Sequence, residues 1–275
     1  MSIDKRKPAT RAAHLGRHPR RFLGAVNTPV LRATTMLFHT VSDLEKAARN
    51  EFDGIGYGLH GLPTVTDLQT AVAAIEGAHA ALAVPSGLTA TTLPLLALSR
   101  PGDHVLVTDS VYGPTRRFCN NHLMRLGVET SYYDPLIGAE IERDFRPNTR
   151  IVFTESPGSL TFEVQDLSAI AEVVHRRGAL VIHDNSWATP FGFRSFDHGA
   201  DVSVHAATKY IGGHSDVLLG LILCNQATFP ALHRLWTDIG VTASPDDSFL
   251  ALRGFRTLPI RLARHADSAL KIAQW

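Results

Sequence analysis

The chain has 275 residues, of which 44% are hydrophobic and 19% are charged, as in a folded globular protein rather than a disordered or fibrous one. Its 27 lysines and arginines nearly balance its 26 aspartates and glutamates, so the net charge of +1 provides no basic face for nucleic acid. The two cysteines, Cys119 and Cys224, lie far apart and form no CxxC motif, which favours a reducing compartment over a disulfide-stapled fold.

An N-terminal arm is expected over residues 1–60. Seven basic residues lie between positions 5 and 21 with no apolar run behind them, so this segment is not a secretory signal. A solvated arm is favoured over an organellar transit peptide. Within the arm, Ser42–Asn50 predicts a short helix with Ser42 as its N-cap and Glu45 completing a capping box. Because the N-terminal segment is not a secretory signal, we expect a cytoplasmic protein.

The longest uncharged stretch, Ala80–Ser99, is long enough to cross a bilayer. Pro85, Gly87 and Pro94 interrupt it, however, and its hydroxyl groups would need partners within lipid. We expect a strand, a turn and a buried helix in this stretch, and no contact with a membrane.

From Pro63 onward, short apolar runs alternate with helical stretches. The expected helices are Thr66–Glu76, Leu88–Leu98, Thr115–Leu126 and Ser168–Arg177. The expected strands are Ala81–Pro85, His104–Thr108, Thr130–Tyr133, Ile151–Glu155, Ala179–His183, Val202–His205 and Gly220–Cys224. This alternation favours an α/β fold with a mainly parallel seven-stranded sheet flanked by helices. After the last strand, Arg256–Trp275 predicts a long amphipathic helix.

Polar residues at strand ends are the candidates for chemistry, because ligands bind outside the carboxyl ends of the strands in such a sheet. Lys209 follows an apolar strand and precedes a glycine pair. We expect its stem to be buried, so that desolvation makes its amine nucleophilic, although a surface lysine fits the same position. Asp184 ends the most apolar strand, where it serves a ligand or acts as a cap or ion-pair partner.

Two further segments carry weaker signals. Ser86–Thr89 lies between a strand and a helix, where free N–H groups bind anions, and a plain turn is the alternative. Tyr112 is either a stacking platform or a core aromatic. His214, Ser215 and Asp216 are adjacent and do not converge as a catalytic triad would. The 14 histidines show no metal-ligand spacing, and a glycine-rich nucleotide fingerprint is missing.

In this order, the turn, the tyrosine, the strand-end aspartate and the strand-end lysine resemble the large domain of fold type I pyridoxal-phosphate (PLP) enzymes. The amino-acid sequences of seven segments, spread over nearly the whole chain, resemble those of the Cys/Met metabolism family. The matching segments are Tyr57–Thr64 (YGLHGLPT), Val84–Ala90 (VPSGLTA), Asp109–Thr115 (DSVYGPT), Asp134–Gly138 (DPLIG), Thr154–Val164 (TESPGSLTFEV), His183–Pro190 (HDNSWATP) and Val202–Asp216 (VSVHAATKYIGGHSD).

The resemblance implies a role for each candidate residue. Lys209 would hold PLP as a Schiff base and act as general base and acid. Asp184 would pair with the ring nitrogen, and Tyr112 would stack on the ring. The phosphate-binding residues that the resemblance implies are Ser86, Gly87, Leu88 and Thr208.

The resemblance also implies an oligomer and an activity. Tyr57 is similar to a residue that a neighbouring subunit contributes to the phosphate site, so we expect a homotetramer built from dimers that share active sites. Ser159, which the resemblance also implies to be a cofactor-binding residue, stands where γ-acting relatives carry asparagine. The segment Glu155–Ser159 (ESPGS) is the form of the β-acting members. The implied reaction cleaves L-cystathionine to homocysteine, pyruvate and ammonia in methionine biosynthesis. A γ-synthase or γ-lyase reaction is the alternative.

The sequence departs from the family pattern in two ways. Leu59 and His60 stand where relatives carry a phosphate-binding arginine, so His60 is a hypothetical substitute that lacks the bidentate fork of arginine. The family's smaller C-terminal domain, with the arginine that binds the substrate carboxylate, has no counterpart here. We expect an inter-subunit arm over residues 1–60, a PLP-binding large domain over residues 61–255 and a linking helix over residues 256–275. A truncated, catalytically impaired PLP-binding protein is the second alternative, and a nucleotide-binding α/β protein, disfavoured by the missing glycine fingerprint, is the third.

Overall fold

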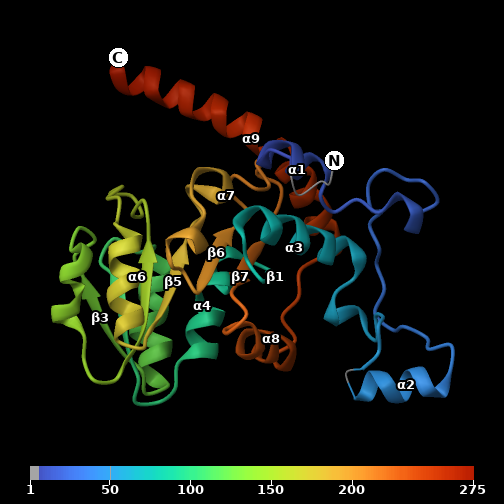
Figure 1. Cartoon of the computed structure of the whole chain (residues 1–275), viewed down its shortest axis with the longest axis horizontal. Helices are drawn as coiled ribbons and strands as arrows, with labels where there is room; N and C mark the ends of the chain where they lie inside the picture. Colours follow the sequence, from blue (N-terminus) through green and yellow to red (C-terminus); the bar gives the residue numbers. More distant parts are fainter. Residues whose placement is uncertain (1–5, 50) are drawn as a thin grey trace.

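A seven-stranded sheet with helices on both faces forms the body of the protein (Figure 1). The computed structural model describes residues 6–49 and 51–275. The strands are β1 (Ala80–Val84), β2 (His104–Thr108), β3 (Glu129–Tyr133), β4 (Thr149–Glu155), β5 (Leu180–Asp184), β6 (Val202–Ala206) and β7 (Gly220–Cys224). All seven strands predicted from the apolar runs are confirmed, with ends that agree within two residues.

The strand order is β1-β7-β6-β5-β4-β2-β3, and the strands from β2 to β6 run parallel. Strand β7 runs antiparallel to both of its neighbours, β1 and β6. A parallel pairing of β6 with β7 would need a long crossover, usually a helix. Residues 207–219 form turns and irregular backbone instead, so the chain reverses direction. The expected mainly parallel sheet is confirmed, with one reversed strand.

Each face of the sheet buries its own set of helices, because successive residues of a strand point to opposite sides. Helices α4 (Gly87–Leu98), α5 (Gly113–Phe118) and α8 (Phe229–Asp238) cover one face, where Ile182 is buried. Helix α6 (Leu167–Arg176) covers the other face at Val181, and α3 (Pro63–Glu76) and α9 (Pro245–Gln274) cover it near β1 and β7.

The other helical segments connect or flank this body. They are α1 (Pro8–His14), α2 (Val41–Ala48), α7 (Thr189–Gly192), the 3₁₀ turns Pro19–Arg21, Gly58–His60, Gly138–Asp144 and Ser195–His198, and the π-helical turn Cys119–Leu123 that continues α5. Within residues 6–49 and 51–275, no helix combines the length and the apolar character that crossing a bilayer requires.

The N-terminus of α2 differs from the prediction. The side chain of Thr40 caps the helix by accepting the N–H of Asp43 at 3.1 Å. Ser42 therefore lies inside the helix, and the predicted capping box of Ser42 with Glu45 is wrong. Both Thr40 and Ser42 carry a hydroxyl group that can accept the N–H groups of a helix start. The residue types alone therefore do not decide between the two caps. The predicted end of this helix, Asn50, lies outside the described residues.

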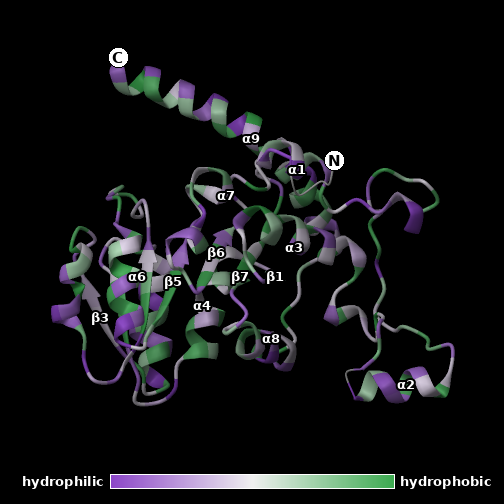
Figure 2. Ribbon diagram, viewed as in Figure 1, coloured by the Kyte–Doolittle hydropathy of each residue, from purple (hydrophilic) through white to green (hydrophobic). Residues whose placement is uncertain are grey.

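Helix α9 is longer than predicted, because it begins at Pro245 rather than at Arg256. Ser244 caps it by accepting the N–H groups of Asp246 at 3.2 Å and Asp247 at 3.3 Å. Its first half packs on the body, whereas its second half projects away from the sheet (Figure 1). Figure 2 shows hydrophobic and hydrophilic residues mixed along this projecting part. Its exposed large apolar residues are Ile260, Leu270, Ile272 and Trp275.

Gly254 allows α9 to touch the backbone that follows Lys209. A Cβ atom here would lie 2.2 Å from the carbonyl oxygen of Gly212 and 2.4 Å from that of Ile211. Alanine favours a helix over glycine by about 1 kcal/mol. A clash with backbone is not relieved by a rotamer change, however, and overpacking costs about 1–3 kcal/mol.

We therefore expect Gly254→Ala to lower the free energy of unfolding by about 1–2 kcal/mol in urea denaturation. The matched control is Gly113→Ala in the first turn of α5, where no atom lies within 4 Å of the added Cβ. This control should be neutral or slightly stabilising. Equal stabilities of the two variants would contradict the close-contact explanation.

Candidate active site

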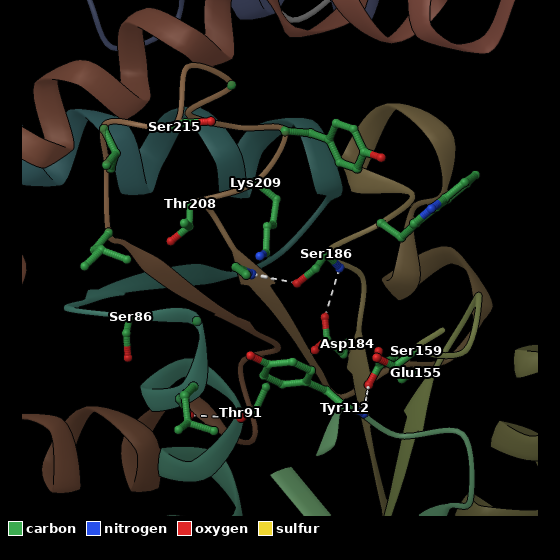
Figure 3. Close-up of a pocket in the computed structure, with 18 of the residues that line it drawn as sticks. Ser86, Thr91, Tyr112, Glu155, Ser159, Asp184, Ser186, Thr208, Lys209 and Ser215 are labelled. Carbon is green, nitrogen blue, oxygen red and sulfur yellow. Dashed lines mark hydrogen bonds between the residues drawn. The ribbon is translucent and has the colours of Figure 1, made fainter. Parts of the chain in front are cut away.

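The predicted strand-end residues converge on one cavity of about 1210 Å³ at the carboxyl ends of β4, β5 and β6 (Figure 3). Eight of the nine predicted site residues line it: Ser86, Gly87, Leu88, Tyr112, Ser159, Asp184, Thr208 and Lys209. The place agrees with the rule that ligands bind outside the carboxyl ends of strands in an open α/β sheet.

Two carboxyl groups, that of the buried Asp184 and that of the half-buried Glu155, stand side by side in this cavity. Glu155 ends β4 and Asp184 ends β5, and the two residues are paired in register. Asp184 is 8% exposed and accepts the N–H of Ser186 at 2.9 Å. Glu155 accepts the N–H of Tyr112 at 2.7 Å. Burial raises the pKa of both groups, and with the added charge of Asp184 the pKa of Glu155 reaches about 8. A cation in the cavity would therefore stabilise this acidic pair.

Lys209 lies in a turn just after β6. Its N–H donates to the carbonyl of Ala206 at 2.9 Å, and its own carbonyl accepts the N–H of Gly213 at 2.8 Å. Figure 3 shows its side chain reaching toward Ser186 and Asp184, on the same side of the sheet as Tyr112. The predicted burial of its stem is wrong, because Lys209 projects into the open cavity and is exposed.

The first turn of α4 forms another wall of the cavity. Ser86 is the N-cap, and its Oγ accepts the N–H of Thr89 at 3.1 Å. The N–H groups of Gly87 and Leu88 have no acceptor within the helix, as at any helix start. A Cβ on Gly87 would lie 2.5 Å from the Cβ of Ala206, so only glycine lets the turn pack against the end of β6. An anion at this place would meet free N–H groups.

The remaining predicted residues differ in how they are engaged. The hydroxyl of Thr208 accepts the N–H of Leu219 at 3.1 Å and donates to the carbonyl of Leu219 at 3.2 Å. If the hydroxyl of Thr208 donated to a ligand, it would lose its hydrogen bond to the carbonyl of Leu219. The Ser159 N–H donates to the carbonyl of Ser110 at 2.8 Å, which fixes the loop after β4. Tyr112 is 45% exposed, which suits a stacking platform and excludes a core position.

The sequence matches the family described as Cys/Met metabolism PLP-dependent enzyme over residues 9–275. The chain belongs to this family. It is 49% identical to a candidate cystathionine beta-lyase of Rhizobium johnstonii over 97% of this chain and 66% of that protein. It is 41% identical to cystathionine beta-lyase MetC of Escherichia coli over 98% of this chain and 69% of that protein. The chain thus spans about two thirds of the length of these relatives.

A solved structure supports the same family fold. The crystal structure of metB from Corynebacterium glutamicum aligns with a TM-score of 0.92 and 32% identity, over all of this chain and 70% of that one. The Cys/Met metabolism family includes several reactions. The chain is also 39% identical to an L-alanine/L-glutamate racemase of Wolbachia pipientis, over 94% of this chain and 66% of that protein, and 35% identical to an L-methionine gamma-lyase of Pseudomonas putida, over 97% and 68%.

The residues of the cavity fit PLP, the cofactor of the Cys/Met metabolism family. PLP has an aldehyde for an amine such as Lys209, a phosphate for the free N–H groups of α4, and a ring nitrogen that is cationic when protonated. A cationic ring nitrogen would reduce the repulsion between the neighbouring carboxylates of Asp184 and Glu155. The donor set therefore matches each end of the cofactor.

The cavity residues that were not among the predicted site residues include Glu155, Ser186 and Trp187. Glu155 ends an apolar strand, which is the signal that pointed to Asp184, so the sequence contained the information needed to include it. The Oγ of Ser186 accepts the N–H of Ala206 at 2.7 Å and so joins the end of β5 to that of β6. No sequence signal marks Ser186, because its partner is set by the strand order.

Tyr57 and His60 lie outside the residues that line the cavity, in the segment before α3. Tyr57 is 46% exposed, and its backbone forms an isolated antiparallel bridge with Thr35. The rings of Tyr57 and His60 meet edge to face, with centroids 6.0 Å apart. The expected contribution of Tyr57 to a neighbouring subunit and the substitution of His60 for arginine stay predictions.

Proposed function

We propose that this chain forms the PLP-binding part of a carbon–sulfur lyase that cleaves L-cystathionine by β-elimination to homocysteine, pyruvate and ammonia. The observation that carries the proposal is the convergence of Lys209, Asp184 and Tyr112, from three separate segments, on one cavity. Support for the reaction comes from the names of the relatives at 41% and 49% identity.

Each of these three side chains has a defined role in the proposed reaction. PLP, when bound, supplies an electron sink that makes the Cα proton of the substrate acidic. The amine of Lys209 would hold the cofactor covalently and, once released, would take the Cα proton as general base and return a proton as general acid. The carboxylate of Asp184 would pair with the ring nitrogen and favour its protonated form, and the ring of Tyr112 would stack on the ring of the cofactor.

The proposed phosphate site consists of Ser86, the N–H groups of Gly87 and Leu88, and Thr208, with Tyr57 from a second copy of the chain. This arrangement requires a homo-oligomer, for which we propose a homotetramer built from dimers that share active sites. We further propose that residues 1–60 are the inter-subunit arm, residues 61–255 the large domain and residues 256–275 a linking helix. The cytoplasm is the proposed compartment, because Cys119 and Cys224 are both free and buried.

The choice of β- over γ-elimination rests on Ser159 and is tested by the products. Protein loaded with PLP is incubated with L-cystathionine, and the 2-oxo acids are separated by chromatography. We expect pyruvate and homocysteine in equal amounts. Formation of 2-oxobutanoate instead would show a γ-acting enzyme. The absence of any 2-oxo acid from protein that binds PLP would favour the impaired PLP-binding alternative, and Lys209→Ala serves as the blank.

A further inference from the structure

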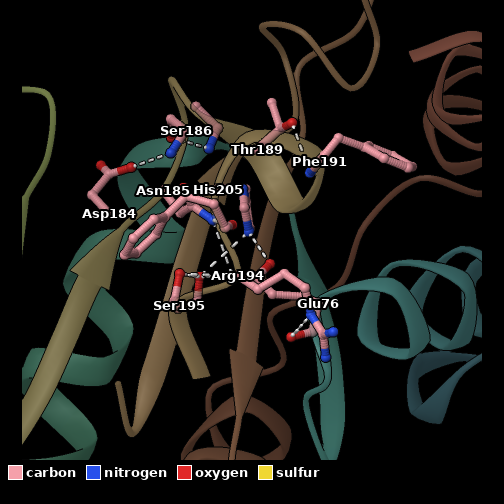
Figure 4. Close-up of polar contacts among 12 residues, drawn as sticks. Glu76, Asp184, Asn185, Ser186, Thr189, Phe191, Arg194, Ser195 and His205 are labelled. Carbon is pink, nitrogen blue, oxygen red and sulfur yellow. Dashed lines mark hydrogen bonds and ion pairs between the residues drawn. The ribbon is translucent and has the colours of Figure 1, made fainter. Parts of the chain in front are cut away.

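A buried polar cluster surrounds Glu76, the last residue of α3 (Figure 4). Glu76 is 0% exposed. Its Oε1 accepts hydrogen bonds from Asn185 Nδ2 at 3.1 Å, Ser195 Oγ at 2.8 Å and Ser203 Oγ at 2.5 Å. Its Oε2 lies 2.6 Å from His205 Nε2. The proposed reaction uses none of these five side chains directly.

The cluster lies on the side of the sheet opposite the cavity. Val202 and Val204 of β6 pack with the helices of the α4 face, so Ser203 and His205, which alternate with them, point toward α3. Ala206 again faces α4, as its contact with Gly87 requires. The cavity and the cluster thus share the ends of β5 and β6 but occupy opposite faces.

Glu76 is a carboxylate anion within this cluster. Its burial opposes ionisation and is the largest influence, but the charge of His205 and the hydrogen bonds from His205, Ser203 and Ser195 together lower the pKa of Glu76 to about 2. A buried charge of this kind adds little stability compared with well-packed apolar side chains. Its presence is better explained by a geometry that it enforces.

That geometry concerns the two strands that lead to Asp184 and Lys209. Asn185 directly follows Asp184 at the end of β5, and its Nδ2 donates to Glu76. His205 directly precedes Ala206, whose carbonyl accepts the N–H of Lys209. The side chain of Glu76 therefore contacts both strand ends. On β5 its partner is the residue next to Asp184, and on β6 its partner is the residue next to the one that binds the backbone of Lys209.

We propose that Glu76 and His205 are a positioning pair, whose contact fixes the ends of β5 and β6 relative to each other and thereby sets the separation of Asp184 and Lys209. The inference rests on the proposed function, because this separation matters only if one rigid ligand meets both residues. A site of this kind requires its groups to be held within about 0.5 Å.

The test compares two substitutions of His205 in the purified protein. His205→Leu removes the donor to Glu76 and keeps a side chain of similar bulk, whereas His205→Gln keeps an N–H donor. The measurements are the dissociation constant for PLP, by absorbance titration, and the circular dichroism of the cofactor band for each bound PLP. We expect His205→Leu to raise the dissociation constant about tenfold, as the loss of outer-shell partners does at metal sites, and to weaken the dichroism. His205→Gln should stay within about twofold.

The control is Asp201→Asn, which perturbs the same strands at their opposite ends. Asp201 accepts the N–H of Val181 at 2.8 Å and Asn225 Nδ2 at 2.8 Å. This variant should lose stability without a change in affinity for PLP. If His205→Leu fails to fold, Ser203→Ala, which removes one donor to Glu76, should raise the dissociation constant about threefold.

Two results would overturn the inference. One is an unchanged dissociation constant and dichroism in His205→Leu, or in Ser203→Ala where it is used. The other is an equal loss of affinity in Asp201→Asn, which would trace the effect to general destabilisation. Failure of the unsubstituted protein to bind PLP would instead overturn the proposed function itself, and that measurement is made before any variant is compared.

Discussion

Lys209→Ala should abolish the absorption band of covalently bound PLP and lower the turnover of L-cystathionine by about 1000-fold or more. Lys209 is the lysine that lines the cavity, and the proposed reaction needs its amine twice, once to bind the cofactor and once to move the Cα proton. The measurements are an absorbance spectrum of the protein with added PLP and a pyruvate assay.

The loss should not come from unfolding. Lys209 is exposed, so its truncation removes no core packing and should change the free energy of unfolding by less than about 0.5 kcal/mol. Lys271→Ala is the matched control, because this lysine lies on the projecting part of α9, where it pairs with Asp267 at 2.9 Å. It should keep both the band and the turnover. A Lys209→Ala protein that still shows the band and forms pyruvate would refute the assignment.

Without PLP, the protein should become less stable as the pH rises from about 5 to 9, by about 4 kcal/mol. Burial first, and then the charge of Asp184, raises the pKa of Glu155 from 4.5 to about 8. The folded state therefore binds this proton more tightly than the unfolded state does. The contribution is complete below the unfolded pKa, disappears as the pH rises through the folded pKa, and does not change further above it.

Glu155→Gln tests this origin, because glutamine keeps the shape and an acceptor for the N–H of Tyr112 but does not ionise. Urea denaturation across pH 5 to 9 should give a flatter stability curve for this variant, with the largest gain over the parent near pH 9. The control, Glu172→Gln on the exposed side of α6, should keep the slope of the parent. Parallel curves for Glu155→Gln and the parent would show that another group causes the slope.

The positions of the strands were readable from local sequence. The run from Ala179 to His183 is almost wholly apolar, as a strand covered on both faces must be, and the structure places β5 at Leu180–Asp184. A polar residue directly after such a run lies at a strand end, where parallel strands bring ligand-binding groups together. This reasoning brought Asp184, Lys209 and the turn at Ser86 to one cavity, although they are distant in sequence.

Several features of the site had no local signal. The exposure of Lys209 depends on which elements cover the cavity, so the expected burial of its stem was wrong. The reversal of β7 depends on turns in residues 207–219 that the apolar pattern does not describe. Glu76 closes an ordinary helix in the sequence, and its partners Asn185 and His205 lie 109 and 129 positions away.

The amino-acid sequence by itself determined the seven strands, most of the helices and the residue types available for chemistry, because hydrophobic periodicity and capping act over a few neighbouring residues. Only the tertiary structure decided that Glu155 stands beside Asp184, that Gly87 presses against Ala206 and that Glu76 joins two strand ends from the opposite face. These contacts depend on the strand order and on close packing between distant segments, which no local pattern specifies.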